Sequence, residues 1–162
     1  MDKQLEHLAQ QLSKRLLNKG LVITTAESCT GGWVAKVLTD IAGSSAWFER
    51  GFVTYSNAAK QEMLGVAPAL IEAQGAVSEG VVQEMVRGAI ARSGADLALA
   101  VSGVAGPGGG SEEKPVGTVW FAWGRSGSAP LARRVHFTGD RDQIRRQAVL
   151  TALQGALDLI EQ

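Results

Sequence analysis

Apolar residues recur along this chain, first with the spacing of a helix and then with that of a strand. Between residues 3 and 18, leucines three and four residues apart form one apolar face, and Lys19-Gly20 is a typical helix end. The same spacing predicts five further helices, over residues 31–42, 57–64, 68–74, 78–93 and 140–160. Asp140 is the predicted cap of the last helix, because Gln143 follows it by three residues.

Short apolar runs between these helices predict five strands, over residues 21–25, 51–55, 96–101, 116–123 and 131–137. The run DLALAV at 96–101 is typical of a central strand that helices cover on both faces. The last two strands flank the turn sequence GRSGSAP and predict a late β-hairpin. We therefore predict an α/β fold, a single three-layer α/β/α domain over residues 1–162 with a mostly parallel or mixed sheet.

Three polar segments follow the first three predicted strands. They are AESCTGG at 26–32, YSNAAK at 55–60 and SGVAGPGGG at 102–110. In open α/β sheets, ligands bind outside the carboxyl ends of the strands. If these three strands are parallel, all three segments lie at the same edge of the sheet and form the walls of one site.

Charge and cysteine content narrow the class of protein. The formal net charge is zero, which argues against nucleic acid or an acidic membrane surface as a partner, because both require a basic face. The single cysteine cannot form an internal disulfide, and neither a signal-peptide core nor a run of about 20 apolar residues is present. We expect a cytoplasmic protein. No His/Cys/Asp group has the spacing of metal ligands, so we expect no metal.

Ser28 lies at the turn between a predicted strand and a predicted helix, where its hydroxyl can be aimed at a substrate. The backbone N–H groups of Thr30, Gly31 and Gly32 could then stabilise a developing oxyanion. The alternative is that Ser28 or Thr30 only caps the helix. Cys29 is a competing nucleophile, but no histidine is near it in the pattern, and a small packed residue is the better interpretation.

A serine nucleophile needs a base, and Lys60 is the candidate. Neither His7 nor His136 is suitably placed, whereas a lysine can serve a serine if desolvation keeps it neutral. Tyr55 could relay a proton or orient Lys60. Taken alone, a lysine on a short helix is more often a solvated surface group.

The glycine-rich segment and the last helix offer groups that could bind an anion. The N–H groups around Ser102, Gly103 and Gly106 could cradle a phosphate or a sugar, although the segment lacks the phosphate-loop pattern and a mobile connection is an equal alternative. Arg141 and Arg145 lie four residues apart near the start of the last helix. They could hold a phosphate together with free N–H groups, or simply be neutralised by neighbouring aspartates.

Five blocks, in order along residues 20–155, resemble the nicotinamide-nucleotide amidase family, the C-terminal domain class of the CinA competence/damage-inducible proteins. The blocks are TTAESCTGG, GSSAWFERGFVTYSNAAK, GAVSE, SGVAGPGGGSEEKPVGTVWFAW and GDRDQIRRQA, and the chain has the length of the stand-alone bacterial form. The resemblance implies that the chain hydrolyses the carboxamide of nicotinamide mononucleotide (NMN) to nicotinic acid mononucleotide and ammonia. This reaction recycles the pyridine nucleotide that NAD consumers such as bacterial DNA ligase release.

The resemblance also implies the roles of individual residues. Ser28 would be the nucleophile, Lys60 its base and Tyr55 a supporting group, and the glycines after Ser28 would line the oxyanion region. The segment 102–106 and the two arginines would contact ribose and phosphate, and no cofactor is implied. Two alternatives are a nucleotide-binding module without turnover and an amidase for another carboxamide. Trp47-Phe48, in a predicted loop, could cover the face of a homodimer or pack in the core.

Overall fold

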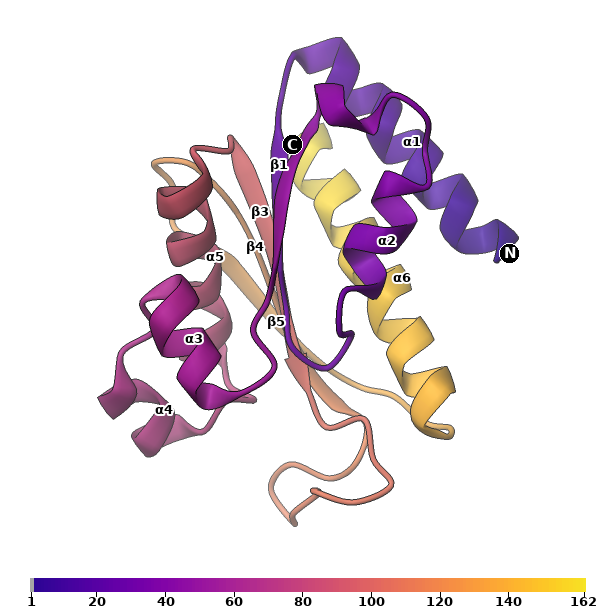
Figure 1. Ribbon diagram of the computed structural model, residues 1–162. Coiled ribbons are helices and arrows are strands. Elements are labelled where there is room, and N and C mark those ends of the chain that lie inside the picture. Colours follow the sequence, from indigo (N-terminus) through magenta and orange to yellow (C-terminus); the bar gives the residue numbers. More distant parts are fainter. Residues whose placement is uncertain (1) are drawn as a thin grey trace.

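The computed structural model describes residues 2–162 as a five-stranded sheet between two layers of helices (Figure 1). The elements in chain order are α1 (Lys3–Lys19), β1 (Ile23–Glu27), α2 (Trp33–Thr39), the 3₁₀ helix η1 (Ser44–Ala46), β2 (Phe48–Val53), α3 (Asn57–Leu64), α4 (Pro68–Gln74), α5 (Glu79–Ser93), β3 (Leu97–Gly103), β4 (Thr118–Arg125), β5 (Leu131–His136) and α6 (Arg141–Glu161). Apart from the short η1, the predicted order of helices and strands is confirmed. Within the described residues, no helix combines the length and the apolar character that crossing a membrane requires.

The sheet is mixed, with the strand order β2-β1-β3-β4-β5. Strands β2 and β3 both pair with β1 in parallel, whereas β4 is antiparallel to β3 and to β5. The predicted late hairpin is therefore β4–β5. Because β1, β2 and β3 run the same way, the three polar segments that follow them lie at one edge of the sheet, the lower edge in Figure 1.

Helices cover both faces of the sheet and create two apolar clusters. α1, α2 and α6 pack on one face, and α3, α4 and α5 cover the other (Figure 1). Strand β3 is buried along nearly its whole length, as its apolar sequence predicts. The chain leaves β1 toward α2 on one face and leaves β2 toward α3 on the other. In doubly wound sheets, such a reversal opens a crevice outside the carboxyl ends of the strands.

The predicted boundaries of β1 and β2 differ from the observed ones. Strand β1 extends to Glu27, so that Ser28 is the first residue after it. The prediction of a loop holds for Trp47, which lies in a turn, and is wrong for Phe48, which begins β2. Of the two alternatives for Trp47, packing in the core is confirmed, because its side chain is buried there. β2 is an edge strand with mostly exposed residues, and this weakens the apolar pattern that marks a strand. Trp47 therefore does not form a dimer face, and the homodimer stays a prediction.

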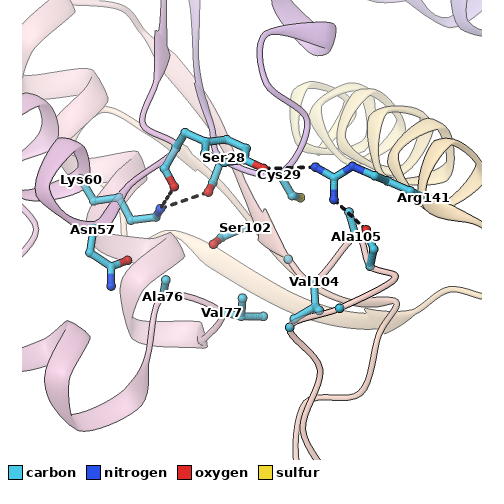
Figure 2. Close-up of a pocket in the computed structure, with 15 residues that line it drawn as sticks. Ser28, Cys29, Asn57, Lys60, Ala76, Val77, Ser102, Val104, Ala105 and Arg141 are labelled. Atoms are coloured by element: carbon cyan, nitrogen blue, oxygen red, sulfur yellow. Dashed lines mark hydrogen bonds between the residues drawn. The ribbon is translucent and has the colours of Figure 1, made fainter.

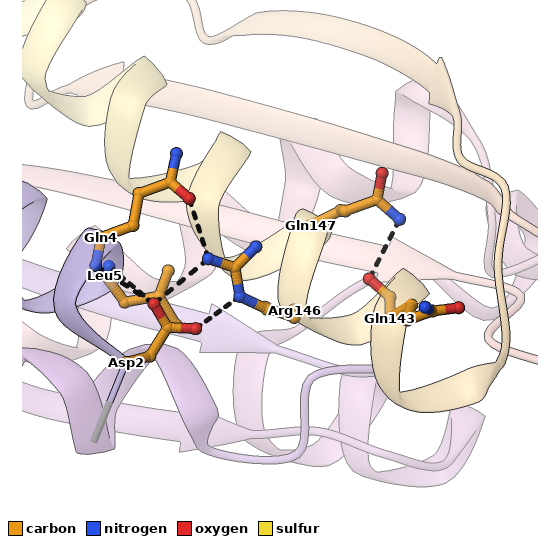
Figure 3. A network of polar contacts seen from close by, with 6 residues as sticks. All are labelled: Asp2, Gln4, Leu5, Gln143, Arg146 and Gln147. Carbon is orange, nitrogen blue, oxygen red and sulfur yellow. Dashed lines mark hydrogen bonds and ion pairs between the residues drawn. The ribbon is translucent and has the colours of Figure 1, made fainter.

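The start of α6 is fixed by polar contacts at two places. The predicted capping box is confirmed, since Asp140 Oδ1 accepts a hydrogen bond from the Gln143 N–H at 2.9 Å and Asp140 N–H donates to Gln143 Oε1 at 2.8 Å. One turn further on, Arg146 pairs with the carboxylate of Asp2 and donates to Gln4 Oε1 (Figure 3). Asp2 also caps α1, so this pair joins the start of α1 to the second turn of α6.

The bounds of α3 agree with the predicted range 57–64. Its N-cap is Ser56, whose Oγ accepts a hydrogen bond from the Ala59 N–H at 3.0 Å.

Candidate active site

A cavity of about 290 Å³ lies at the sheet edge where β1, β2 and β3 end (Figure 2). Its lining comes from the turn after β1, from the connection between β2 and α3 and the start of α3, from the connection between α4 and α5, from the end of β3 and the segment after it, and from the first residue of α6. The lining residues are Ser28, Cys29, Tyr55, Asn57, Lys60, Ala76, Val77, Ser102, Gly103, Val104, Ala105, Gly106, Gly108, Gly109 and Arg141. All three polar segments singled out in the sequence thus contribute to one site.

Ser28 and Lys60 meet at the wall of this cavity. The Lys60 Nζ lies 3.0 Å from the Ser28 Oγ, within hydrogen-bonding distance, although 32 positions separate the two residues along the chain. Strand pairing holds the main chain of Ser28, since its N–H donates to the Val101 carbonyl at 2.9 Å. The Lys60 side chain extends from α3, which follows the neighbouring strand, toward Ser28 (Figure 2).

The surroundings of Lys60 favour a neutral amine. The residue is only 1% exposed, and burial lowers the pKa of Lys60. Apart from its contact with Ser28 Oγ, Nζ donates to the carbonyls of Thr54 at 2.9 Å and Tyr55 at 3.4 Å, and no carboxylate in the described part of the chain pairs with it. A neutral amine has two N–H donors and one lone pair. Two carbonyls can take the donors, and the lone pair is then left for the Ser28 hydroxyl.

Glu27 explains why so many polar groups crowd the turn after β1. Its carboxylate is fully buried and accepts hydrogen bonds from Thr30 Oγ1 at 2.6 Å, Val34 N–H at 2.9 Å and Ala35 N–H at 3.0 Å. It therefore caps α2, whose N-cap residue Gly32 has no side chain to do so. Sequence reasoning missed this role. The signal was a carboxylate at the end of a strand followed by a helix that starts with glycine.

We expect Glu27→Gln to destabilise the fold. A glutamine turns an NH₂ group toward one of the N–H donors, so that a buried donor loses its acceptor, and the free energy of unfolding should fall by about 1–3 kcal/mol. Urea denaturation followed by circular dichroism measures this. Glu72→Gln, an exposed glutamate on α4, is the matched control and should change stability by less than about 0.5 kcal/mol. Equal effects of the two substitutions would contradict the capping role of Glu27.

Arg141 joins two walls of the cavity. Its Nη1 donates to the Gly106 carbonyl at 2.7 Å and its Nη2 donates to the Tyr55 hydroxyl at 3.1 Å. Gly106 has a φ of +79°, and a Cβ there would lie 2.4 Å from Val116 Cγ1, so this position requires glycine. The hydrogen bond between Tyr55 and Lys60 is made by the Tyr55 carbonyl, whereas the Tyr55 hydroxyl is the group that bonds Arg141, and the residue is 61% exposed.

The predicted site residues divide into two groups. Seven line the cavity, namely Ser28, Lys60, Tyr55, Ser102, Gly103, Gly106 and Arg141. The other four, Thr30, Gly31, Gly32 and Arg145, do not line it. Thr30 is fully buried with its hydroxyl on Glu27, the Gly31 N–H donates to the Ser28 carbonyl at 3.0 Å, and Arg145 contacts backbone carbonyls. Thr30, Gly31 and Arg145, which the sequence had suggested as substrate-binding groups, instead make hydrogen bonds within the protein that stabilise the turn.

Several lining residues were not predicted from the sequence. Asn57 lies one helical turn before Lys60 and faces the same cavity, together with the apolar side chains of Ala76, Val77, Val104 and Ala105 (Figure 2). A helical spacing of three residues from the candidate lysine was the only signal for Asn57. Cys29 also lines the cavity, and burial raises the pKa of its thiol to about 12. This thiol stays protonated near neutral pH and is a poor nucleophile.

Comparison with known proteins identifies the family of this chain. The pattern of the family described as "CinA C-terminal domain" matches residues 5–160. The chain belongs to the CinA C-terminal domain family. This CinA domain is 60% identical over 153 residues to the "Nicotinamide-nucleotide amidohydrolase PncC" of Escherichia coli K12, which covers 94% of this chain and 93% of the relative. A protein of the same name from Pseudomonas putida is 57% identical, with 94% of each chain covered.

The fold of this CinA domain also matches a solved structure. The competence/damage inducible protein CihA from Agrobacterium tumefaciens superposes with a TM-score of 0.96 at 45% identity, over 100% of this chain and 98% of that one. The predicted α/β fold is therefore confirmed. Among the described residues, no group of three or more His, Cys, Asp or Glu side chains is arranged to hold a metal ion.

Proposed function

We propose that this CinA domain is an amidohydrolase that converts NMN to nicotinic acid mononucleotide and ammonia, with Ser28 as nucleophile and Lys60 as general base. One observation carries the proposal, namely the 3.0 Å distance between Ser28 Oγ and the buried Lys60 Nζ in the cavity. The high identity to proteins named nicotinamide-nucleotide amidohydrolase supports the choice of substrate. The reaction returns nicotinamide nucleotide to NAD synthesis, and we place it in the cytoplasm.

The first half of the reaction forms an acyl-enzyme. Neutral Lys60 takes the proton of the Ser28 hydroxyl as the Ser28 Oγ attacks the carboxamide carbon. The resulting ammonium lies close to the reacting centre and transfers the proton to the departing nitrogen. The C–N bond breaks, ammonia leaves, and Lys60 is neutral again.

The second half releases the product. Water takes the place of ammonia, Lys60 accepts one of its protons, and the hydroxide oxygen attacks the ester that joins Ser28 to the substrate. Collapse of this intermediate returns the proton to Ser28 Oγ and frees nicotinic acid mononucleotide. Both halves use one base at one place, which is the arrangement that the Ser28–Lys60 pair supplies.

Arg141 is the group we assign to the substrate phosphate. It lines the cavity, and within residues 2–162 its guanidinium donates hydrogen bonds only to the neutral oxygens of Gly106 and Tyr55. A phosphate can replace such partners with two parallel charge-assisted hydrogen bonds. The apolar side chains of Ala76, Val77, Val104 and Ala105 offer contacts for the pyridine ring.

A substrate panel tests the proposal. Release of ammonia is measured with NMN, with nicotinamide riboside and with free nicotinamide, and we expect NMN to have the highest kcat/KM. Arg141→Met should lower kcat/KM for NMN about 10- to 100-fold, because hydrogen bonds to a charged group contribute about 1.5–3 kcal/mol, and should change the riboside much less. Binding of NMN without ammonia release would favour a nucleotide-binding module. Equal turnover of all three compounds would favour an amidase for another carboxamide.

A further inference from the structure

We propose that Arg145 is a positioning residue that holds the nucleophile turn, residues 28–32, in its reactive geometry, and that it is not a phosphate ligand. The inference rests on the proposed function of Ser28. It gives the two arginines on α6 different roles, with Arg141 binding the phosphate and Arg145 positioning the turn. Arg141 lines the cavity, whereas Arg145, one helical turn further along, does not.

In the part of the chain that the structure describes, the hydrogen bonds of Arg145 go to the nucleophile turn, and its cation–π contact is with the first residue of α2. Its Nε donates to the Cys29 carbonyl at 3.0 Å and its Nη2 donates to the Thr30 carbonyl at 3.3 Å. A Cβ on Gly31 would lie 3.4 Å from the same Nη2, so the guanidinium lies directly against the turn. Its Cζ is 5.6 Å from the centre of the Trp33 ring, a favourable cation–π distance.

The hydrogen bonds from Arg145 add to others that already hold the nucleophile turn. The Ser28 N–H is held by β3, the Ser28 carbonyl accepts from Gly31, and Glu27 holds Thr30 and the start of α2 from inside the fold. In the described residues, Arg145 supplies the only hydrogen bond to the Cys29 carbonyl. Cys29 is 6% exposed, so loss of Arg145 leaves a nearly buried carbonyl without a partner directly after the nucleophile.

The helix that carries Arg145 is well suited to set a position. α6 is 21 residues long, starts with a capping box and packs into the core along its buried face. Fixed on such a helix, the guanidinium presents two donors in a rigid plane. Arg145 reaches residues 116 and 115 positions away in the chain, and thereby ties the turn to the same helix that carries Arg141.

Kinetics with two substrates separate positioning from phosphate binding. Arg145→Met should lower kcat about 10- to 100-fold for both NMN and nicotinamide riboside, since small misplacements of a reacting group have effects of this size. The ratio of kcat/KM between the two substrates should stay as in the wild type. Arg141→Met is the matched variant and should collapse that ratio. A collapse of the ratio in Arg145→Met, or a kcat within twofold of the wild type, would overturn the inference.

A second readout does not depend on the substrate. A fluorophosphonate reagent carries no nucleotide and reacts with an activated serine, so its rate of labelling Ser28 reports the geometry of the nucleophile alone. We expect labelling at least tenfold slower in Arg145→Met. We expect intermediate labelling in Arg145→Lys, which keeps a cationic donor group without the rigid planar fork and serves if the methionine variant does not fold. Labelling of either folded variant at the wild-type rate would overturn the inference. A wild type that is labelled but releases no ammonia would refute the proposed function instead.

Discussion

Ser28→Ala should lower kcat for NMN by about 10⁴- to 10⁶-fold, because removing a serine nucleophile leaves only binding and electrostatic effects. We expect a loss of this size because the Ser28 hydroxyl lines the cavity and lies 3.0 Å from the buried Lys60 Nζ. KM for NMN should change little, since the hydroxyl is small and the rest of the cavity is intact. Steady-state ammonia release measures kcat, and equilibrium binding of NMN to the variant checks that the site still forms.

Cys29→Ala is the control for this experiment. The thiol lies in the same turn and lines the same cavity, but burial raises the pKa of Cys29 to about 12, so it should not act as a nucleophile. The variant should keep kcat within about threefold once its fraction folded is accounted for. If Cys29→Ala is inactive and Ser28→Ala is not, the nucleophile has been assigned to the wrong residue.

Lys60→Met should abolish turnover to a similar extent, and it should also change how stability depends on pH. Burial lowers the pKa of Lys60 in the folded protein below the value of 10.5 that it has when unfolded. Between these two pKa values the unfolded chain binds more protons, so the free energy of unfolding rises with pH. As far as Lys60 affects it, the free energy of unfolding is therefore highest above pH 10.5, the ordinary pKa, and decreases as pH falls to the lowered pKa of the folded protein. Methionine removes this dependence, and the variant should gain stability relative to the wild type as pH falls.

Two measurements check the behaviour of Lys60. Urea unfolding of wild type and Lys60→Met at several pH values gives the stability difference, which should grow toward lower pH. In the wild type, kcat/KM for NMN should rise with pH through the lowered pKa of Lys60, since only the neutral amine can accept the Ser28 proton. A stability difference that is constant with pH, or kcat/KM that falls with rising pH over this range, would show that Lys60 is not a base of lowered pKa.

The sequence predicted the parts of the fold that depend on local patterns. Apolar spacing gave the helices and strands in order, and Asp140 with Gln143 gave the cap of α6. It failed at Phe48, because the edge strand that begins there has mostly exposed residues and therefore carries little apolar pattern. The family motifs pointed to Ser28 and Lys60, and the fold brings the two side chains together.

The sequence by itself determined which chemical groups follow each strand, because a strand, a turn and a helix start are specified by residues close together in the chain. Only the tertiary structure decided which of those groups face the cavity. Glu27, Thr30 and Arg145 turn away from it to hold the turn, while Asn57 and Arg141 face it. The physical reason is that buried backbone donors and acceptors must find partners, and those of the turn find theirs partly on α6, 115 and 116 residues away. A pattern of neighbouring residues cannot predict contacts between residues so far apart in the chain.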